Sequence, residues 1–342
     1  MPGKKLLLFS SIAVLLVVVI SVFAHRHWHL NDGQGEREKM LSLMPEDAST
    51  VAYVDLAQLR ATPVLSALFR WAPKPTIEDD YGKFLQATGF NYETDLDRVV
   101  LAIRREPHEM PAFAVAEGRF DRKKIEAYAL QYSSLKTADG KTLFAIPLNG
   151  SNRKVFFTFL RSDQIEWAND SSFFFQSKRT GSAAEWREHF SRLAGTPIFA
   201  VLRQDSEAAT ALAQAPSSLR SPELAALLAQ LQWISISAKP DGNLLRVGVE
   251  GECLTESTER QLKEMLSGLV VLAQMGLNDP KTRKQLDPKE REGYLELLQS
   301  ADIQQIDRGT SKSVRVIFEV TPRLLEAGQS SLVGADPVKN GN

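Results

Sequence analysis

Few residues in this chain have side chains suited to proton transfer, metal binding or nucleophilic attack, because it has only five histidines and one cysteine. His108 lies in a polar run around Pro107, which predicts a loop. His189 lies beside Trp186 and Phe190 at helical spacing, which predicts a position at the edge of a core. Neither histidine is surrounded by a pattern that would supply a nucleophile and an orienting carboxylate. We therefore predict that neither is catalytic.

The other candidates are isolated matches to short motifs. Ser133 and Lys136 have the S-x-x-K spacing of some acyl-transfer enzymes, but the partner motifs are missing and the surrounding segment indicates a turn-rich connector. Cys253 ends an expected strand, which favours a small buried side chain. Asp95 and Asp97 are typical of turns. A hydrolase that uses paired carboxylates stays open as an alternative, because it depends on a separation in space.

Three of the histidines are clustered directly after an apolar run, at residues 25–29 (HRHWH). His25 and His29 would share a helix face, but no cysteine or carboxylate lies at ligand spacing. Trp28 is typical of a membrane–water interface instead. The chain has no H-E-x-x-H, paired-cysteine, P-loop or G-x-G-x-x-G motif. We predict no metal site, no cofactor and no catalytic residue, and the sequence favours a non-enzymatic protein.

The composition is that of a globular protein without a nucleic-acid partner. Of 342 residues, 43% are hydrophobic and 24% charged, enough to bury a core. Lys and Arg number 41 against 42 Asp and Glu, so the basic excess that neutralises phosphates is absent. One cysteine allows no intramolecular disulfide.

The N-terminus predicts a single membrane anchor. Residues 6–24 carry no charge and are dominated by Leu, Val and Ile, and about 20 apolar residues span a bilayer. Lys4 and Lys5 precede this helix, which places residues 1–5 in the cytoplasm and the body outside. The prediction is a single-pass protein of the bacterial inner membrane, with its body in the periplasm or extracytoplasmic space. Cleavage before His25 as a signal peptide stays open and gives the body the same location.

The body predicts an α+β fold made of two similar halves. Residues 25–42 indicate a juxtamembrane linker and 326–342 a flexible tail. Between them, 43–194 and 195–325 each predict the order β-α-β-β-α-β, that of a ferredoxin-like sandwich. Glu117-Gly118 in the first half matches Glu250-Gly251 in the second, which indicates an internal duplication. Helices are predicted to begin at Pro63 and after Asp121 and Asp287, and the helix after Asp121 carries Ile125, Tyr128 and Ala129 on one face.

Two apolar segments could serve recognition. Phe173-Phe174-Phe175 follows an expected hairpin, and part of it could be exposed. The helix predicted over 256–276 becomes apolar all round from Gly268 to Ala273, a pattern usual for buried core. Exposure of either segment would mark a partner surface.

The run LMPEDASTVAYVDLAQLR, residues 43–60, resembles uncharacterised bacterial envelope proteins with an N-terminal anchor. The resemblance implies a bacterial origin and an extracytoplasmic body, and implies no functional residue. The leading hypothesis is a non-enzymatic binding body that takes a protein or an envelope component as partner. The alternatives are the carboxylate hydrolase and a carrier of lipid or another small ligand, which would require a large apolar cavity between sheet and helices.

Overall fold

The computed structural model describes residues 33–63, 80–106, 110–138, 141–147, 154–175, 184–204, 226, 229–309 and 311–325. The predicted span 6–24, the histidines at 25–29, His108, the tail 326–342 and most of the helix expected from Pro63 lie outside these residues. Within the described ranges, no helix is long and apolar enough to cross a membrane.

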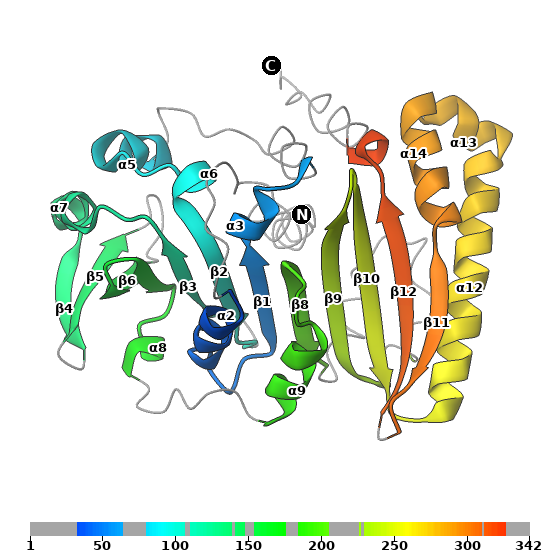
Figure 1. The fold of residues 1–342 in the computed structure, drawn as a ribbon, viewed down its shortest axis with the longest axis horizontal. Helices are drawn as coiled ribbons and strands as arrows, with labels where there is room; N and C mark the ends of the chain where they lie inside the picture. The colour runs from blue at the N-terminus through cyan, green and yellow to red at the C-terminus, as the bar shows by residue number, and fades with distance from the viewer. Residues whose placement is uncertain are drawn as a thin grey trace, which may run out of the picture. The chain divides into compact units, whose positions relative to one another are not determined.

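The described elements form two compact units, and the N-terminal unit holds those from α2 to β8 (Figure 1). Its helices are α2 (Gly33–Ser42), α3 (Leu56–Leu59), α5 (Asp80–Thr88), α6 (Tyr92–Asp95), α7 (Arg122–Tyr132), α8 (Ser172–Phe175) and α9 (Ala184–Arg192). Its strands are β1 (Thr50–Asp55), β2 (Leu96–Ile103), β3 (Ala112–Gly118), β4 (Ser134–Ala138), β5 (Lys141–Pro147), β6 (Lys154–Arg161), β7 (Gln164–Ala168) and β8 (Ile198–Arg203).

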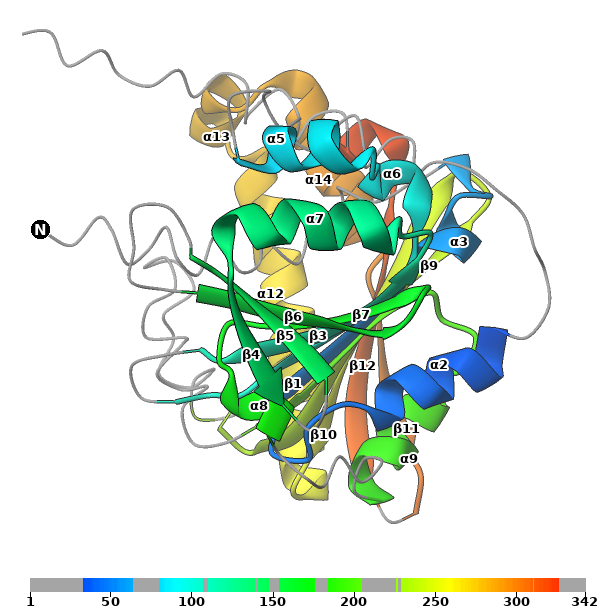
Figure 2. The same ribbon diagram turned by 90° about the vertical axis from the view of Figure 1, so that its left-hand side faces the viewer.

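These strands form an antiparallel sheet in the order β8-β1-β2-β3-β7-β6-β5-β4. Helices cover both of its faces, with α5 and α7 on one side and α2 and α9 on the other (Figure 2). Burial on both faces explains why β1 is buried along almost its whole length and does not alternate with polar residues.

The C-terminal unit holds β9 (Leu231–Asp241), β10 (Leu244–Cys253), α12 (Glu256–Asn278), α13 (Pro280–Gln285), α14 (Pro288–Gln299), β11 (Asp302–Asp307) and β12 (Lys312–Val320). Its strands are antiparallel in the order β11-β12-β10-β9. The start of α12 packs on this sheet through Leu262, which joins Leu231, Cys253 and Val314 in one buried cluster.

The helix starts follow from local sequence. Asp121, Thr255 and Asp287 each accept a hydrogen bond from a backbone N–H in the first turn of α7, α12 and α14. This satisfies an amide that the helix itself leaves without an acceptor. The predicted helices after Asp121 and Asp287 are therefore confirmed, and so is the α+β class with its antiparallel sheets.

Three sequence predictions are wrong. Residues 33–42 of the predicted linker form helix α2, because Met40 and Leu41 are buried and the Arg37 guanidinium lies over the Phe199 ring. Helix α2 is thus stabilised by its packing against the rest of the unit rather than by a helical pattern in its own sequence. The connector predicted around Ser133 contains β4, which pairs with β5.

The third correction concerns the boundary between halves, predicted between residues 194 and 195. Strand β8 pairs with β1 over Ile198 to Leu202, so it belongs to the N-terminal unit, which extends to Arg203. A boundary drawn from element order alone cannot locate such a strand, because strand pairing is a long-range contact.

Candidate functional site

An apolar pocket of about 290 Å³ in the N-terminal unit is lined by residues of α5, of α7 and of the sheet strands. Both helices lie on the same side of the sheet (Figure 2). Every side chain that lines it is aliphatic or aromatic: Phe84, Phe90, Leu96, Ala116, Phe120, Ile125, Tyr128, Ala129, Ile146, Val155, Phe157, Ile165 and Trp167. No carboxylate, histidine or lysine is among them. The pocket is thus suited to hold an apolar molecule, and the Tyr128 phenol is the only titratable side chain among its lining residues.

Strand alternation places the sheet side of this lining. Successive side chains on a strand point to opposite faces, so residues two apart share a face. Ile165 and Trp167 on β7 therefore point to the same side, and their cross-strand neighbours Ala116 on β3 and Phe157 on β6 do so too. These residues form one continuous apolar floor.

Aromatic contacts hold the helical side. The Phe84 ring on α5 meets the Tyr128 ring on α7 edge to face, with centroids 5.4 Å apart. Phe90 stacks on Phe120 at 5.4 Å, and Phe120 meets Phe159 at 6.4 Å. Such ring pairs stabilise a core by about 0.5–1.5 kcal/mol each beyond area burial. The wall is therefore fixed by packing rather than by polar contacts.

Several large side chains around the pocket are only half-buried. Phe84, Phe120, Ile146, Ile165 and Trp167 pack against the buried cluster and keep part of their surface exposed. Apolar surface left in contact with water raises the free energy of the folded state by roughly 25 cal/mol per Å². A bound apolar molecule would remove that penalty, which is why such a hollow suits a ligand.

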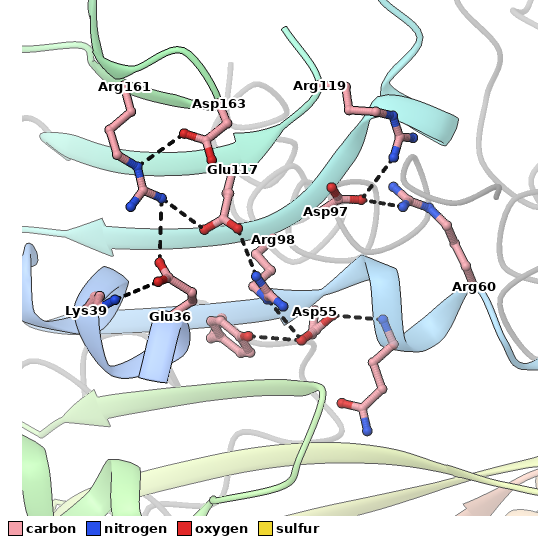
Figure 3. Close-up of polar contacts among 12 residues, drawn as sticks. Glu36, Lys39, Asp55, Arg60, Asp97, Arg98, Glu117, Arg119, Arg161 and Asp163 are labelled. Carbon is pink, nitrogen blue, oxygen red and sulfur yellow. Dashed lines mark hydrogen bonds and ion pairs between the residues drawn. The ribbon is translucent and has the colours of Figure 1, made fainter. Parts of the chain in front are cut away.

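The opposite face of the sheet carries a row of charges (Figure 3). Asp55, Arg98 and Glu117 are cross-strand neighbours on β1, β2 and β3. Arg98 binds Asp55 at 3.3 Å and Glu117 at 2.8 Å. Opposite charges directly across strands stabilise the pairing, so the row fixes the register of these three strands.

The row continues to helix α2 through Arg161. Its Nη2 lies 3.8 Å from Glu117 Oε2 and 3.5 Å from Glu36 Oε2, and Lys39 binds Glu36 at 2.6 Å (Figure 3). The hydrogen bond from Lys39 lowers the pKa of Glu36, whereas burial raises the pKa of Glu117. Two carboxylates therefore approach each other here, but Arg161 joins them and neither lines the pocket.

The carboxylates singled out in the sequence are also held by partners. Asp97 is shared by Arg60 and Arg119, and Asp95 accepts a hydrogen bond from the Asn91 amide at 2.8 Å. They are structural anchors of the segment before β2. In the described ranges, no group of three or more histidine, cysteine, aspartate or glutamate residues is placed to hold a metal ion.

The nucleophile and base candidates are not brought together. His189 is buried on α9, with Arg192 near its Nδ1 at 3.5 Å. Ser133 ends α7, and Cys253 is buried at the end of β10, where burial raises its thiol pKa to about 11. The core positions predicted for His189 and Cys253 are confirmed.

Each of the two apolar segments singled out in the sequence, Phe173–Phe175 and the second half of α12, is partly exposed. Phe173 and Phe174 are buried while Phe175 is half exposed, as the sequence allowed. The apolar stretch of α12 was predicted to be core, yet Val271 and Leu272 are exposed. The helix keeps Leu262 buried near its start and presents the apolar residues near its end to solvent.

Sequence reasoning missed the pocket itself. Its lining comes from seven elements or their flanking residues, and no window of sequence contains more than a few of them. The one signal was the predicted face of α7, with Ile125, Tyr128 and Ala129 on one side, and all three line the pocket.

No protein-family model matches the chain, and no curated protein matches it. Among solved structures, crystal form III of TP0453 superposes with a TM-score of 0.45 at 10% identity, covering 85% of this chain and 97% of that one. Crystal form I of TP0453 gives 0.43 at 10% identity, covering 85% and 96%. A similarity this low says nothing of function.

Proposed function

We propose that this protein is a non-enzymatic, membrane-anchored binding protein of the bacterial envelope, and that its N-terminal unit carries a small apolar ligand. The observation that supports this most directly is the pocket of about 290 Å³ with a wholly apolar lining between sheet and helices. It is the feature that separates a carrier from the other two functions left open by the sequence.

The size of the pocket limits the ligand class. An engineered apolar cavity of roughly 150 Å³ binds benzene, and drug-sized ligands occupy about 300–1,000 Å³. The volume here suits one fused ring system or a segment of an acyl chain. The aromatic lining favours the same compounds, because its rings offer broad apolar contact.

The hydrolase alternative gains no support from this pocket. General acid–base catalysis needs a titratable group within hydrogen-bond reach of the substrate. Tyr128 is the only titratable residue in the lining, and no carboxylate, histidine or lysine lies there beside it. Each of the acidic residues Asp55, Asp97 and Glu117 forms an ion pair with an arginine, and none of them lines the pocket.

The proposal includes an inner-membrane anchor and an origin of the two units by internal duplication. The uncharged run 6–24 after Lys4 and Lys5 supports an inner-membrane anchor with the body outside the cytoplasm. Two units that each contain a strand hairpin, a capped helix and returning strands support descent from one ferredoxin-like half. A carrier held at the membrane would keep its apolar ligand close to the lipid phase.

The test uses full-length protein in detergent and the dye N-phenyl-1-naphthylamine, excited by energy transfer from tryptophan. Trp167 lines the pocket and is the nearest donor. Ala116→Phe fills the pocket from its floor, and Ala127→Phe makes the same change at an exposed position on α7. We expect saturable dye binding in wild type and Ala127→Phe, and at least about a tenfold weaker affinity in Ala116→Phe.

A second variant, Val155→Phe on β6, fills the pocket from another position and keeps the test valid if Ala116→Phe does not fold. Thermal melting checks that each variant is folded. Equal dye binding in all four proteins would show that the signal comes from the micelle or another surface, and the carrier proposal would be wrong. Native mass spectrometry of the wild type should in addition detect a bound apolar compound that the filling variants lack.

A further inference from the structure

The outward face of α12 changes character along its length. Near its start this face carries Arg260 and Glu264, which are exposed and polar. Residues at spacings of three, four and seven continue the same face, and there it presents Val271, Leu272 and Met275 at 53%, 63% and 64% exposure. One helix thus has a solvated polar half and a solvated apolar half.

The exposure is not an incidental gap in packing. A Cβ built on Gly268 or on Gly276 would meet nothing within 4 Å, so the face beside the apolar residues is open. Apolar residues scattered singly over a surface need no explanation, but three on adjacent turns of one stripe form a contiguous patch. Such a patch indicates a surface that another apolar phase covers.

Cations follow the apolar half directly. Helix α13 begins two residues after α12 ends and packs against it (Figure 1). Its Arg283 and Lys284, and Lys289 at the start of α14, are exposed. None of the three takes part in an ion pair within the described ranges, whereas Arg260 pairs with Glu256 on the polar half. Apolar surface and exposed cations that take no part in an ion pair among the described residues therefore meet at one end of the C-terminal unit, where Asp279 and Asp287 are exposed carboxylates.

We infer that this end of the C-terminal unit, Val271, Leu272 and Met275 with Arg283, Lys284 and Lys289, docks on an anionic lipid surface. The chemistry is that of an interfacial helix, whose apolar side chains enter the acyl boundary while nearby cations contact anionic headgroups. This contact is separate from the ligand pocket and from the N-terminal span.

A second copy of the chain fits the same patch less well. In a symmetric pair, the same surface of each partner faces the other. The exposed cations next to the patch would then meet their own copies, and like charges across an interface oppose binding. An anionic membrane satisfies the apolar and the charged part together.

The experiment uses the full chain reconstituted into vesicles, with the buried Cys253 replaced by alanine so that one introduced cysteine carries a bimane dye. Met275→Cys reports on the apolar half. Glu264→Cys is the matched control, exposed on the same face three turns earlier. Vesicles contain nitroxide-labelled phosphatidylcholine, with or without about one third phosphatidylglycerol, and the measurement is quenching of the dye by the nitroxide.

We expect quenching at position 275 in anionic vesicles to exceed that at position 264 by at least twofold. It should fall to the control level in pure phosphatidylcholine, at high salt, and in the double variant Arg283→Glu, Lys284→Glu. Equal quenching at both positions, or none at either, would overturn the proposal. Shielding of position 275 that grows with protein density and does not depend on the nitroxide would overturn it in favour of a second copy.

Discussion

The dipeptide Glu-Gly lies at or near the end of a strand in both units, but its two residues have different neighbours in each. Glu117-Gly118 ends β3, and Glu250-Gly251 lies near the end of β10. In each unit this strand is the second of an antiparallel pair, an N-capped helix follows it, and a later strand, β7 or β12, pairs with its other edge. The surroundings of the two glutamates and of the two glycines then differ.

The glycines differ in what they approach. A Cβ on Gly118 would lie 2.2 Å from the backbone oxygen of Asp95 and 2.9 Å from Leu96 Cα. A Cβ on Gly251 would lie 3.0 Å from a terminal methyl carbon of Leu231. The first obstacle is backbone and cannot move without the strand, whereas the second is the end of a flexible side chain.

The glutamates differ in their partners, although their side chains have nearly equal exposure, 13% and 14%. Glu250 receives hydrogen bonds from Ser313 at 2.9 Å and from Arg315 at 2.7 Å, and Arg308 lies at 2.5 Å. Burial acts to raise the pKa of Glu250, but the bonds from Arg308 and Arg315 outweigh it and lower the pKa to about 2. For Glu117, burial wins and the pKa is raised.

This comparison shows that two identical dipeptides near the ends of strands differ in their energetics because their neighbours differ. Oε2 of Glu117 has no hydrogen-bond partner, and Arg98 divides its donors between Glu117 and Asp55. A buried carboxylate is stabilised in its charged form only when several donors compensate the lost water. Three partners achieve this in the C-terminal unit. In the N-terminal unit, Arg98 is shared with Asp55 and Arg161 lies 3.8 Å from Glu117 without a hydrogen bond, and burial outweighs both.

The largest expected difference is between Gly118→Ala and Gly251→Ala. We expect the first to lower the free energy of unfolding by at least about 3 kcal/mol, since the new methyl group overlaps backbone. The second should lower it by about 1 kcal/mol or less, because Leu231 can shift and alanine restricts the unfolded chain. Urea unfolding of the full-length protein measures both. Equal losses would mean that the two glycines serve the same purpose.

The next effect separates the glutamates. Glu250→Gln should lower the free energy of unfolding at pH 7 by about 2–4 kcal/mol, because Arg308 and Arg315 lose the carboxylate with which both are paired. A depressed pKa contributes stability above the ordinary value of 4.5 that is lost as the pH falls toward about 2. The gap between wild type and Glu250→Gln should therefore close over that range.

Glu117→Gln should have the smaller effect and the opposite trend with pH. A raised pKa means that the folded protein binds the proton more tightly than the unfolded chain, so wild-type stability falls as the pH rises above 4.5. Relative to wild type, Glu117→Gln should gain stability over the same rise. Thermal melts between pH 3 and pH 7 test both trends, and parallel pH profiles for the two variants would contradict the comparison.

These residues also show which parts of the fold could be predicted from the sequence. The element order around both Glu-Gly pairs, the cap at Asp121 and the start of α14 at Asp287 could be predicted, because caps and strand periodicity are local signals. Strands β4 and β11 were missed, since edge strands face solvent and carry polar residues such as Gln304 and Gln305.

What sequence could not supply is the set of long-range contacts. The charge row Asp55–Arg98–Glu117 joins residues 62 positions apart, and its pairing depends on strand register. The pocket likewise needs Ala116 beside Ile165 and the helix face of Ile125 above them. Both features are made by the sheet order, which no local pattern fixes.

The smallest expected difference concerns the caps that follow the two Glu-Gly pairs. Thr255 Oγ1 accepts a hydrogen bond from the Thr258 amide at 3.1 Å, and it also contacts the Thr258 hydroxyl, which donates to Gln230. Thr255→Ala should lower stability by about 1 kcal/mol, and Thr255→Ser should restore most of it. Because this cap is neutral, the loss should not change with salt.

Asp121 caps α7 through the Lys124 amide at 3.2 Å and adds a negative charge at a helix N-terminus. The Lys124 backbone hydrogen bond holds the pKa of the Asp121 carboxyl below its usual range. Asp121→Asn keeps the hydrogen-bond acceptor and removes the charge. At low ionic strength the variant should therefore be less stable than wild type. In high salt, which screens the interaction of Asp121 with the helix dipole, the two proteins should have similar stability. Melting temperatures measured at low and high salt separate the two caps. A salt-independent loss for Asp121→Asn would show that the charge has no role, and that both units cap the helix after Glu-Gly by hydrogen bonding alone.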